Sequence, residues 1–184
     1  MPDYTENIEG ADVIEFDVDE AQDLWAQADE ISEFSGSFEL SYNADGAGNK
    51  EWVEALTNQL RTNLEIEAEP NAFAAFSEFR ELITNREIGT AFRSGWQPDY
   101  PSVYNYLGPV FGTGAGANDG DYSNPDFDSA LRQAASAEED SDRAEALAEA
   151  QAILMEDLPA IPLWNRDAIA ITATGVEGVQ LNWQ

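Results

Sequence analysis

The sequence predicts an α/β fold with a mostly parallel sheet flanked by helices. Three short apolar or alternating segments have the pattern of strands, at 37–43, 64–68 and 88–92. Stretches with apolar residues at helical spacing follow the first two of them. Strands that alternate with helices are usually joined by right-handed crossovers, so this order favours parallel pairing. Five Trp, nine Phe and six Tyr in 184 residues are enough for the core of one domain.

The first 16 residues are polar and acidic and have no period, so we expect a leading segment ahead of a domain at 17–184. Asp17 is a favourable helix N-cap, and Glu20 three residues later completes a capping box. A first helix is therefore expected to follow Asp17 directly. Its apolar residues recur at helical spacing: Val18, Ala21, Leu24, Trp25, Ala28 and Ile31.

The later helices are expected from apolar spacing and from proline and glycine punctuation. They cover residues 50–64, 71–85, 125–137 and 140–157. Pro70 is expected to start the second of these helices. Gly108 to Pro125 is expected to be a glycine-rich surface loop, and two returning strands are expected at 161–164 and 168–172.

The charge balance excludes several classes of protein. With 37 acidic against eight basic residues the formal net charge is −29, so nucleic acid is excluded as a direct partner and an anionic membrane surface is disfavoured. Such a surface fits a secreted protein or one adapted to high salt.

The absence of His and Cys excludes serine–histidine and cysteine–histidine catalysis and the usual zinc sites. We therefore expect no enzyme, no cofactor and no metal.

No apolar run approaches the roughly 20 residues that a membrane span needs. The N-terminal sequence MPDYTENIEG does not have the pattern of a signal peptide. If the intact protein is exported, we expect its targeting sequence to lie outside this chain.

The segment from Phe92 to Pro109, FRSGWQPDYPSVYNYLGP, is the strongest candidate for a functional site. It follows the third expected strand, and open α/β folds place ligand sites at the carboxyl ends of strands. Pro98 and Pro101 restrict the backbone around Asp99, so that this carboxylate is held at little entropic cost. The alternative is a structural turn in which the aromatic residues fill the core and Asp99 caps the next helix.

This segment resembles the signature of the family 5 extracellular solute-binding proteins, the dipeptide, oligopeptide and nickel-complex receptors of ABC importers. The resemblance continues through YSNPDFDSALRQAAS and QAILMEDLPAIPLW, and upstream through FDVDEAQDLWAQA, so it covers about Phe16 to Trp164. It implies the C-terminal lobe of a type II periplasmic-binding-protein fold. The implied partners are a peptide or small-molecule ligand, the missing N-terminal lobe and the transporter permease. The implied location is extracytoplasmic, with a membrane anchor in the intact protein.

The resemblance also implies roles for individual residues. Asp99 stands where the family's aspartate forms a salt bridge with the α-amino group of a peptide ligand. Trp96 would line the adjoining wall, and Tyr100 and Tyr104 would contribute further aromatic surface. Arg93 matches an arginine that meets the ligand carboxylate in some peptide binders, although it could instead pair with Asp99 in the empty state. The family pattern often continues with an acid and a proline after DYP, where this chain has Ser-Val.

Other functions remain open at this point. The aromatic cluster suits sugars almost as well as peptide side chains, so oligosaccharide or nickel-complex binding in the same family is an alternative. A secreted acidic glycoside hydrolase-type domain could use a carboxylate pair, and an interaction module would need no small-molecule site. A calcium loop at Asp119, Asp121 and Ser123 lacks the required glycine and has Ala130 in place of the bidentate glutamate.

Overall fold

The computed structural model describes residues 1, 3–165 and 171–180 of the chain. The chain divides into two compact units, which are described separately. Residues Phe16–Gly95 form one, here called the sheet unit. Met1–Glu15 together with Trp96–Gln184 form the other, here called the helical unit.

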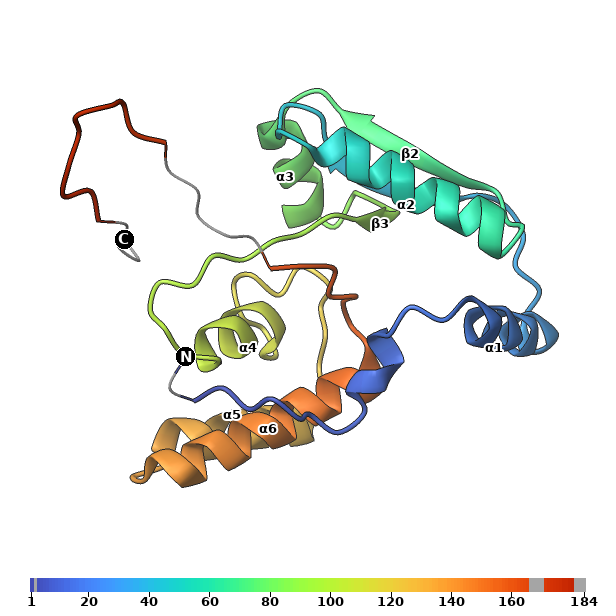
Figure 1. Cartoon of the computed structure of the whole chain (residues 1–184). Helices are drawn as coiled ribbons and strands as arrows, with labels where there is room; N and C mark the ends of the chain where they lie inside the picture. Colours follow the sequence, from blue (N-terminus) through green and yellow to red (C-terminus); the bar gives the residue numbers. More distant parts are fainter. Residues whose placement is uncertain (2, 166–170, 181–184) are drawn as a thin grey trace. The chain divides into compact units, whose positions relative to one another are not determined.

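The sheet unit is built on three parallel strands in the order β2-β1-β3 (Figure 1). The strands are β1 (Phe38–Asn43), β2 (Ala68–Phe73) and β3 (Ala91–Phe92). Leu40 in the central strand pairs with Pro70 on one side and with Ala91 on the other. The expected α/β fold with a parallel sheet flanked by helices is confirmed.

Helices α2 (Asn49–Asn63) and α3 (Phe76–Thr84) pack on opposite faces of the sheet. Side chains alternate along a strand, and Leu40 and Tyr42 on one face of β1 cluster with Val53 of α2. Phe73 lies on the other face, where its ring contacts Phe79 of α3 with centroids 5.9 Å apart. The sheet is therefore covered on both sides, as in parallel sheets generally.

Helix α1 (Val18–Ile31) begins as expected. Asp17 Oδ1 accepts a hydrogen bond from the Glu20 N–H at 3.0 Å, which satisfies one of the free donors of the first turn. No residue of α1 is buried, and Gln22 Nε2 donates to the backbone oxygen of Asn63 at 2.6 Å.

The prediction for the second strand and the helix after it was wrong. The strand runs from Ala68 to Phe73 instead of 64–68, and α3 starts at Phe76 instead of 71. Phe38 N donates to Glu67 O and Ala44 N donates to Phe73 O. The backbone N–H and C=O groups of the odd-numbered residues of β2 therefore point toward β1. The nitrogen of Pro70 therefore points away from β1, where a missing N–H costs no ladder hydrogen bond. The third strand is shorter than the expected 88–92.

The helical unit contains η1 (Ala11–Ile14), α4 (Tyr104–Phe111), α5 (Pro125–Ser136) and α6 (Asp140–Asp157). Helices α5 and α6 lie side by side, and the N-terminal segment runs beside α6 (Figure 1). Helices α4, α5 and α6 share one core of fully or nearly buried residues: Val103, Leu107, Phe127, Ala130, Leu131, Ala134, Ala146, Leu147, Ala150 and Leu154.

The expected loop at 108–125 was wrong at its start, because α4 continues to Phe111 and contains Pro109. Burial of Val103 and Leu107 against the rest of the core outweighs the local preference of the Gly-Pro pair. The expected helices at 125–137 and 140–157 are confirmed as α5 and α6. Residues 161–164 do not form a strand, and the segment 168–172 lies largely outside the described residues.

Replacement of Phe127 by Ala is expected to destabilise the helical unit by about 3–5 kcal/mol, because the side chain is fully buried and would leave a cavity. Thermal unfolding followed by circular dichroism measures the effect. Phe16→Ala is the matched control, since Phe16 is 77% exposed. Equal melting temperatures for the two variants would contradict this account of the core.

Candidate functional site

The ligand loop is defined here as residues 96–103, between the sheet unit and α4. Pro98 is buried, whereas Asp99 and Tyr100 are exposed. Trp96 is 37% exposed, so that part of its indole ring faces solvent. The loop therefore presents one carboxylate and two aromatic side chains on a backbone that proline restricts.

Asn105, in the first turn of α4, holds the ligand loop. The residue is only 3% exposed, and its Oδ1 accepts two hydrogen bonds. One comes from Trp96 Nε1 and the other from the Asp99 backbone N–H, each at 3.1 Å. The indole and the backbone of Asp99 are thus fixed to one atom, while the Asp99 side chain stays exposed.

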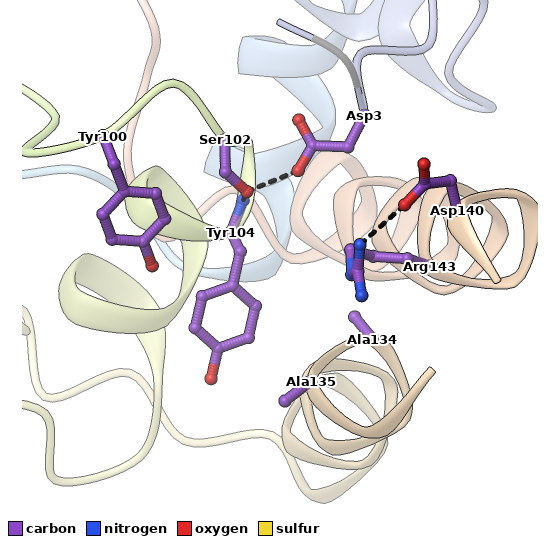
Figure 2. Close-up of a pocket in the computed structure, with 8 residues that line it drawn as sticks. All are labelled: Asp3, Tyr100, Ser102, Tyr104, Ala134, Ala135, Asp140 and Arg143. Carbon is purple, nitrogen blue, oxygen red and sulfur yellow. Dashed lines mark hydrogen bonds and ion pairs between the residues drawn. The ribbon is translucent and has the colours of Figure 1, made fainter. Parts of the chain in front are cut away.

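A pocket of about 380 Å³ opens beside this loop, wholly within the helical unit. It is lined by Asp3, Tyr100, Ser102, Tyr104, Ala134, Ala135, Asp140 and Arg143. Figure 2 shows the two tyrosine rings on one side and Arg143 with Asp140 on the other. Arg143 forms an ion pair with Asp140 at 2.9 Å and donates to the backbone oxygen of Ala137, so the pocket wall has a fixed cation.

Arg93 belongs to the sheet unit, where it follows β3. Its Nε donates to Asn43 Oδ1 at 2.8 Å, and its guanidinium carbon lies 5.7 Å and 5.6 Å from the ring centroids of Phe76 and Phe79. These cation–π contacts and the hydrogen bond fix the guanidinium at the carboxyl end of the central strand. Of the five expected site residues, the structure thus brings Trp96 and Asp99 together through Asn105, and Tyr100 and Tyr104 around one pocket.

Polar side chains also gather where β1 ends. Asn43 is 3% exposed, and its Nδ2 donates to Asp45 Oδ1 at 2.6 Å. Asp45 Oδ2 accepts from the Phe76 N–H at 3.0 Å, at the start of α3. The pKa of the Asp45 carboxyl is lowered, first by the hydrogen bond from Asn43 and then by the one from Phe76.

The segment considered for calcium is organised by its own side chains. Asn118 Nδ2 donates to the backbone oxygens of Gly112 and Tyr122, and its Oδ1 accepts from the Tyr122 N–H. The Tyr122 hydroxyl donates to Asp157 Oδ2 at 2.5 Å, and burial together with this bond raises the pKa of Tyr122. Within the described residues, no group of three or more His, Cys, Asp or Glu side chains is placed to hold a metal ion.

Sequence reasoning missed Asn105, Asn43 and Asp3. A buried polar residue in an apolar helix is a signal that could have singled out Asn105, because such a side chain needs partners. Asn43 ends a strand at the edge where open α/β sheets bind ligands, which is a weaker signal. Nothing in the sequence connects Asp3 to the loop, since the two lie 99 residues apart.

No helix within the described residues combines the length and the apolar character that crossing a membrane requires.

The chain is similar to part of several known peptide-binding and peptide-transport proteins. No family model matches the chain. It is 26% identical over 125 residues to the oligopeptide-binding protein OppA of Bacillus subtilis, covering 68% of this chain and 22% of that protein. It is 35% identical over 91 residues to the peptide transport periplasmic protein SapA of Salmonella typhimurium, covering 48% of this chain and 16% of that protein.

A solved structure agrees with these relatives. The Burkholderia pseudomallei OppA structure superposes with a TM-score of 0.71 at 27% identity, covering 79% of this chain and 28% of that one. Each of these matches covers only part of the known protein. The chain is a partial homologue of the family 5 solute-binding proteins and spans about a fifth of the curated relatives that it matches. These homologues are peptide-binding proteins and not enzymes.

Replacement of Asn105 by Ala is expected to cost about 1–3 kcal/mol in stability of the helical unit, because the Trp96 and Asp99 N–H groups lose their acceptor. Asn105→Asp keeps an acceptor oxygen in place and is expected to retain more of that stability. Chemical denaturation followed by circular dichroism, with the indole Nε1–H resonance of Trp96 as a local probe, measures both. An unchanged Trp96 resonance in Asn105→Ala would contradict the assigned contact.

The lowered pKa of Asp45 predicts a pH dependence of stability in the sheet unit. A carboxyl whose folded pKa is below its unfolded value of about 3.9 stabilises the fold above that pH, and the contribution is lost as the pH falls through the folded pKa. Asp45→Asn is therefore expected to lower the melting temperature at pH 7 and to make little difference at acid pH, below both values. A difference of the same size at both pH values would contradict this assignment.

Proposed function

We propose that this chain is the ligand-binding lobe of a peptide-binding protein of an ABC importer. The observation that carries the proposal is the ligand loop itself. Asn105 fixes the backbone of Asp99 while the carboxylate of Asp99 stays exposed. A carboxylate presented in this way can accept hydrogen bonds from the charged α-amino group of a peptide. Such a charge-assisted contact contributes roughly 1.5–3 kcal/mol to binding.

The aromatic side chains give the second part of the proposal. Trp96 presents part of its indole face beside Asp99, while Tyr100 and Tyr104 line the adjoining pocket. Aromatic rings offer apolar area with a polar edge, which suits peptide side chains of varied chemistry. Arg93 is the proposed partner of the ligand carboxylate, and its guanidinium is oriented by Asn43 and two phenylalanine rings.

The relatives support the same class of ligand. OppA of Bacillus subtilis is named for oligopeptide binding, and SapA of Salmonella typhimurium is named as a periplasmic protein of peptide transport. By extension, the intact protein works outside the cytoplasm, is anchored at the membrane and delivers its ligand to a permease. The ligand is captured between this lobe and an N-terminal lobe by hinge closure, which needs a better fit in the closed state than in the open one.

A peptide titration tests the role of Asp99. The chain is expected to bind trialanine with an affinity no better than about millimolar, because half of the cleft wall is absent. N-acetyl-trialanine lacks the charged amine and is expected to bind at least about tenfold more weakly. Asp99→Asn should remove this preference, and the exposed control Glu145→Gln should keep it.

Nuclear magnetic resonance titration measures these weak affinities. A preference for the free amine that persists in Asp99→Asn would overturn the assigned role. Micromolar binding by this chain alone would contradict capture between two lobes.

A further inference from the structure

Asp3 is a buried carboxylate that reaches the far end of the ligand loop. Its side chain lies in the helical unit and the residue is 7% exposed. Asp3 Oδ1 accepts from the Val103 backbone N–H at 3.0 Å, and Oδ2 accepts from the Ser102 hydroxyl (Figure 2). The Ser102 oxygen in turn accepts from the Tyr104 N–H at 3.1 Å. One carboxylate therefore organises three consecutive residues.

These hydrogen bonds compensate for what the start of α4 lacks. The helix has no acidic residue in its first turn, and its N-cap residue Val103 supplies no side-chain cap. Val103 is 6% exposed, so its N–H would be buried without an acceptor if Asp3 were absent. A carboxylate also interacts favourably with the positive end of the helix dipole. Asp3 thus acts as the cap of a helix that begins about a hundred residues later.

The residues just before α4 explain why a carboxylate from elsewhere in the chain is needed. An acid followed by a proline would provide its own cap, and the proline would have no N–H to satisfy. This chain has Ser102 and Val103 there, so it has no carboxylate of its own at this point and the Val103 N–H needs an acceptor. Val103 has a φ of −60°, a value that proline adopts.

We propose that Asp3 is a positioning residue of the peptide site, because it fixes the end of the ligand loop that Asn105 does not reach. Asn105 fixes the loop at Trp96 and Asp99, and Asp3 fixes it at Ser102 and Val103. Tyr100 lies between these two anchors. The role in binding rests on the proposed function, whereas the role in holding the loop can be tested without a ligand.

Amide hydrogen exchange of the whole chain tests the anchor directly. Asp3→Ala is expected to speed exchange at Val103 and Tyr104 by about tenfold or more relative to the core of α6, because a hydrogen bond to a charged group is lost. Asp12→Asn is the matched control, since Asp12 is an exposed acid of the same N-terminal segment, and it should leave both amides unchanged. Unchanged exchange in Asp3→Ala, or equal acceleration in Asp12→Asn, would overturn the proposal.

The same substitution made in a chain with two further changes before α4 keeps the test decisive if Asp3→Ala alone unfolds the protein. Ser102→Asp with Val103→Pro introduces an acid and a proline before α4, and in this background Asp3→Ala is expected to change Tyr104 exchange by less than about twofold, as a coupled pair of sites requires. If Asp3→Ala is as damaging there as in the natural background, Asp3 acts on the unit as a whole and the proposal fails.

The peptide titration then separates positioning from folding. Asp3→Ala is expected to lose most of the preference for trialanine over N-acetyl-trialanine although Asp99 is intact, and the acid–proline background should restore it. Full preference in a folded Asp3→Ala variant would overturn the positioning role. If the natural chain itself shows no preference, the proposed function fails, and the exchange measurement still decides whether Asp3 holds the loop.

Discussion

One oxygen atom, Asn105 Oδ1, holds the part of the ligand loop that carries Trp96 and Asp99. A loop has no strand ladder to satisfy its backbone, so its polar groups must find side-chain or solvent partners. Asn105 accepts from a backbone N–H and from an indole N–H, and it is itself buried in the first turn of α4. Asp99 is thereby held through its backbone, while the residue itself stays exposed. A charged group presented on an immobilised backbone loses little entropy on binding.

The sheet unit follows a related principle at the carboxyl end of its central strand. Ser41 and Asn43 are buried there, and both are hydrogen-bonded: Ser41 Oγ lies 2.5 Å from Thr90 Oγ1, and Asn43 bonds to Asp45 and Arg93. Buried polar groups that are fully paired define one arrangement of the surrounding loops. In this unit the paired groups orient the guanidinium of Arg93 and the start of α3.

The errors of the sequence predictions have a common physical origin. Pro70 and the Gly-Pro pair before Val110 were interpreted by local preference, as the start of a helix and as a loop. In the fold, Pro70 occupies an edge strand that pairs along its whole length with β1, and Pro109 lies within a helix packed on a buried core. In both places the free energy of pairing or packing with distant residues outweighs a local preference of about 3 kcal/mol or less. Helices α2 and α6, in which no proline or glycine opposes the helix, were predicted to within a residue or two because no such conflict arises.

The sequence by itself determined the α/β class, the acidic surface, the absence of histidine and cysteine chemistry, and the loop that carries Trp96 and Asp99. Each of these is a property of composition or of a short contiguous segment. Only the tertiary structure decided that Asn105 anchors this loop, that Asp3 caps α4, and that Asn43 orients Arg93. The Asp3 and Asn43 contacts join residues 100 and 50 positions apart, and hydrogen-bond partners so distant in the chain are selected by the packing that brings them together.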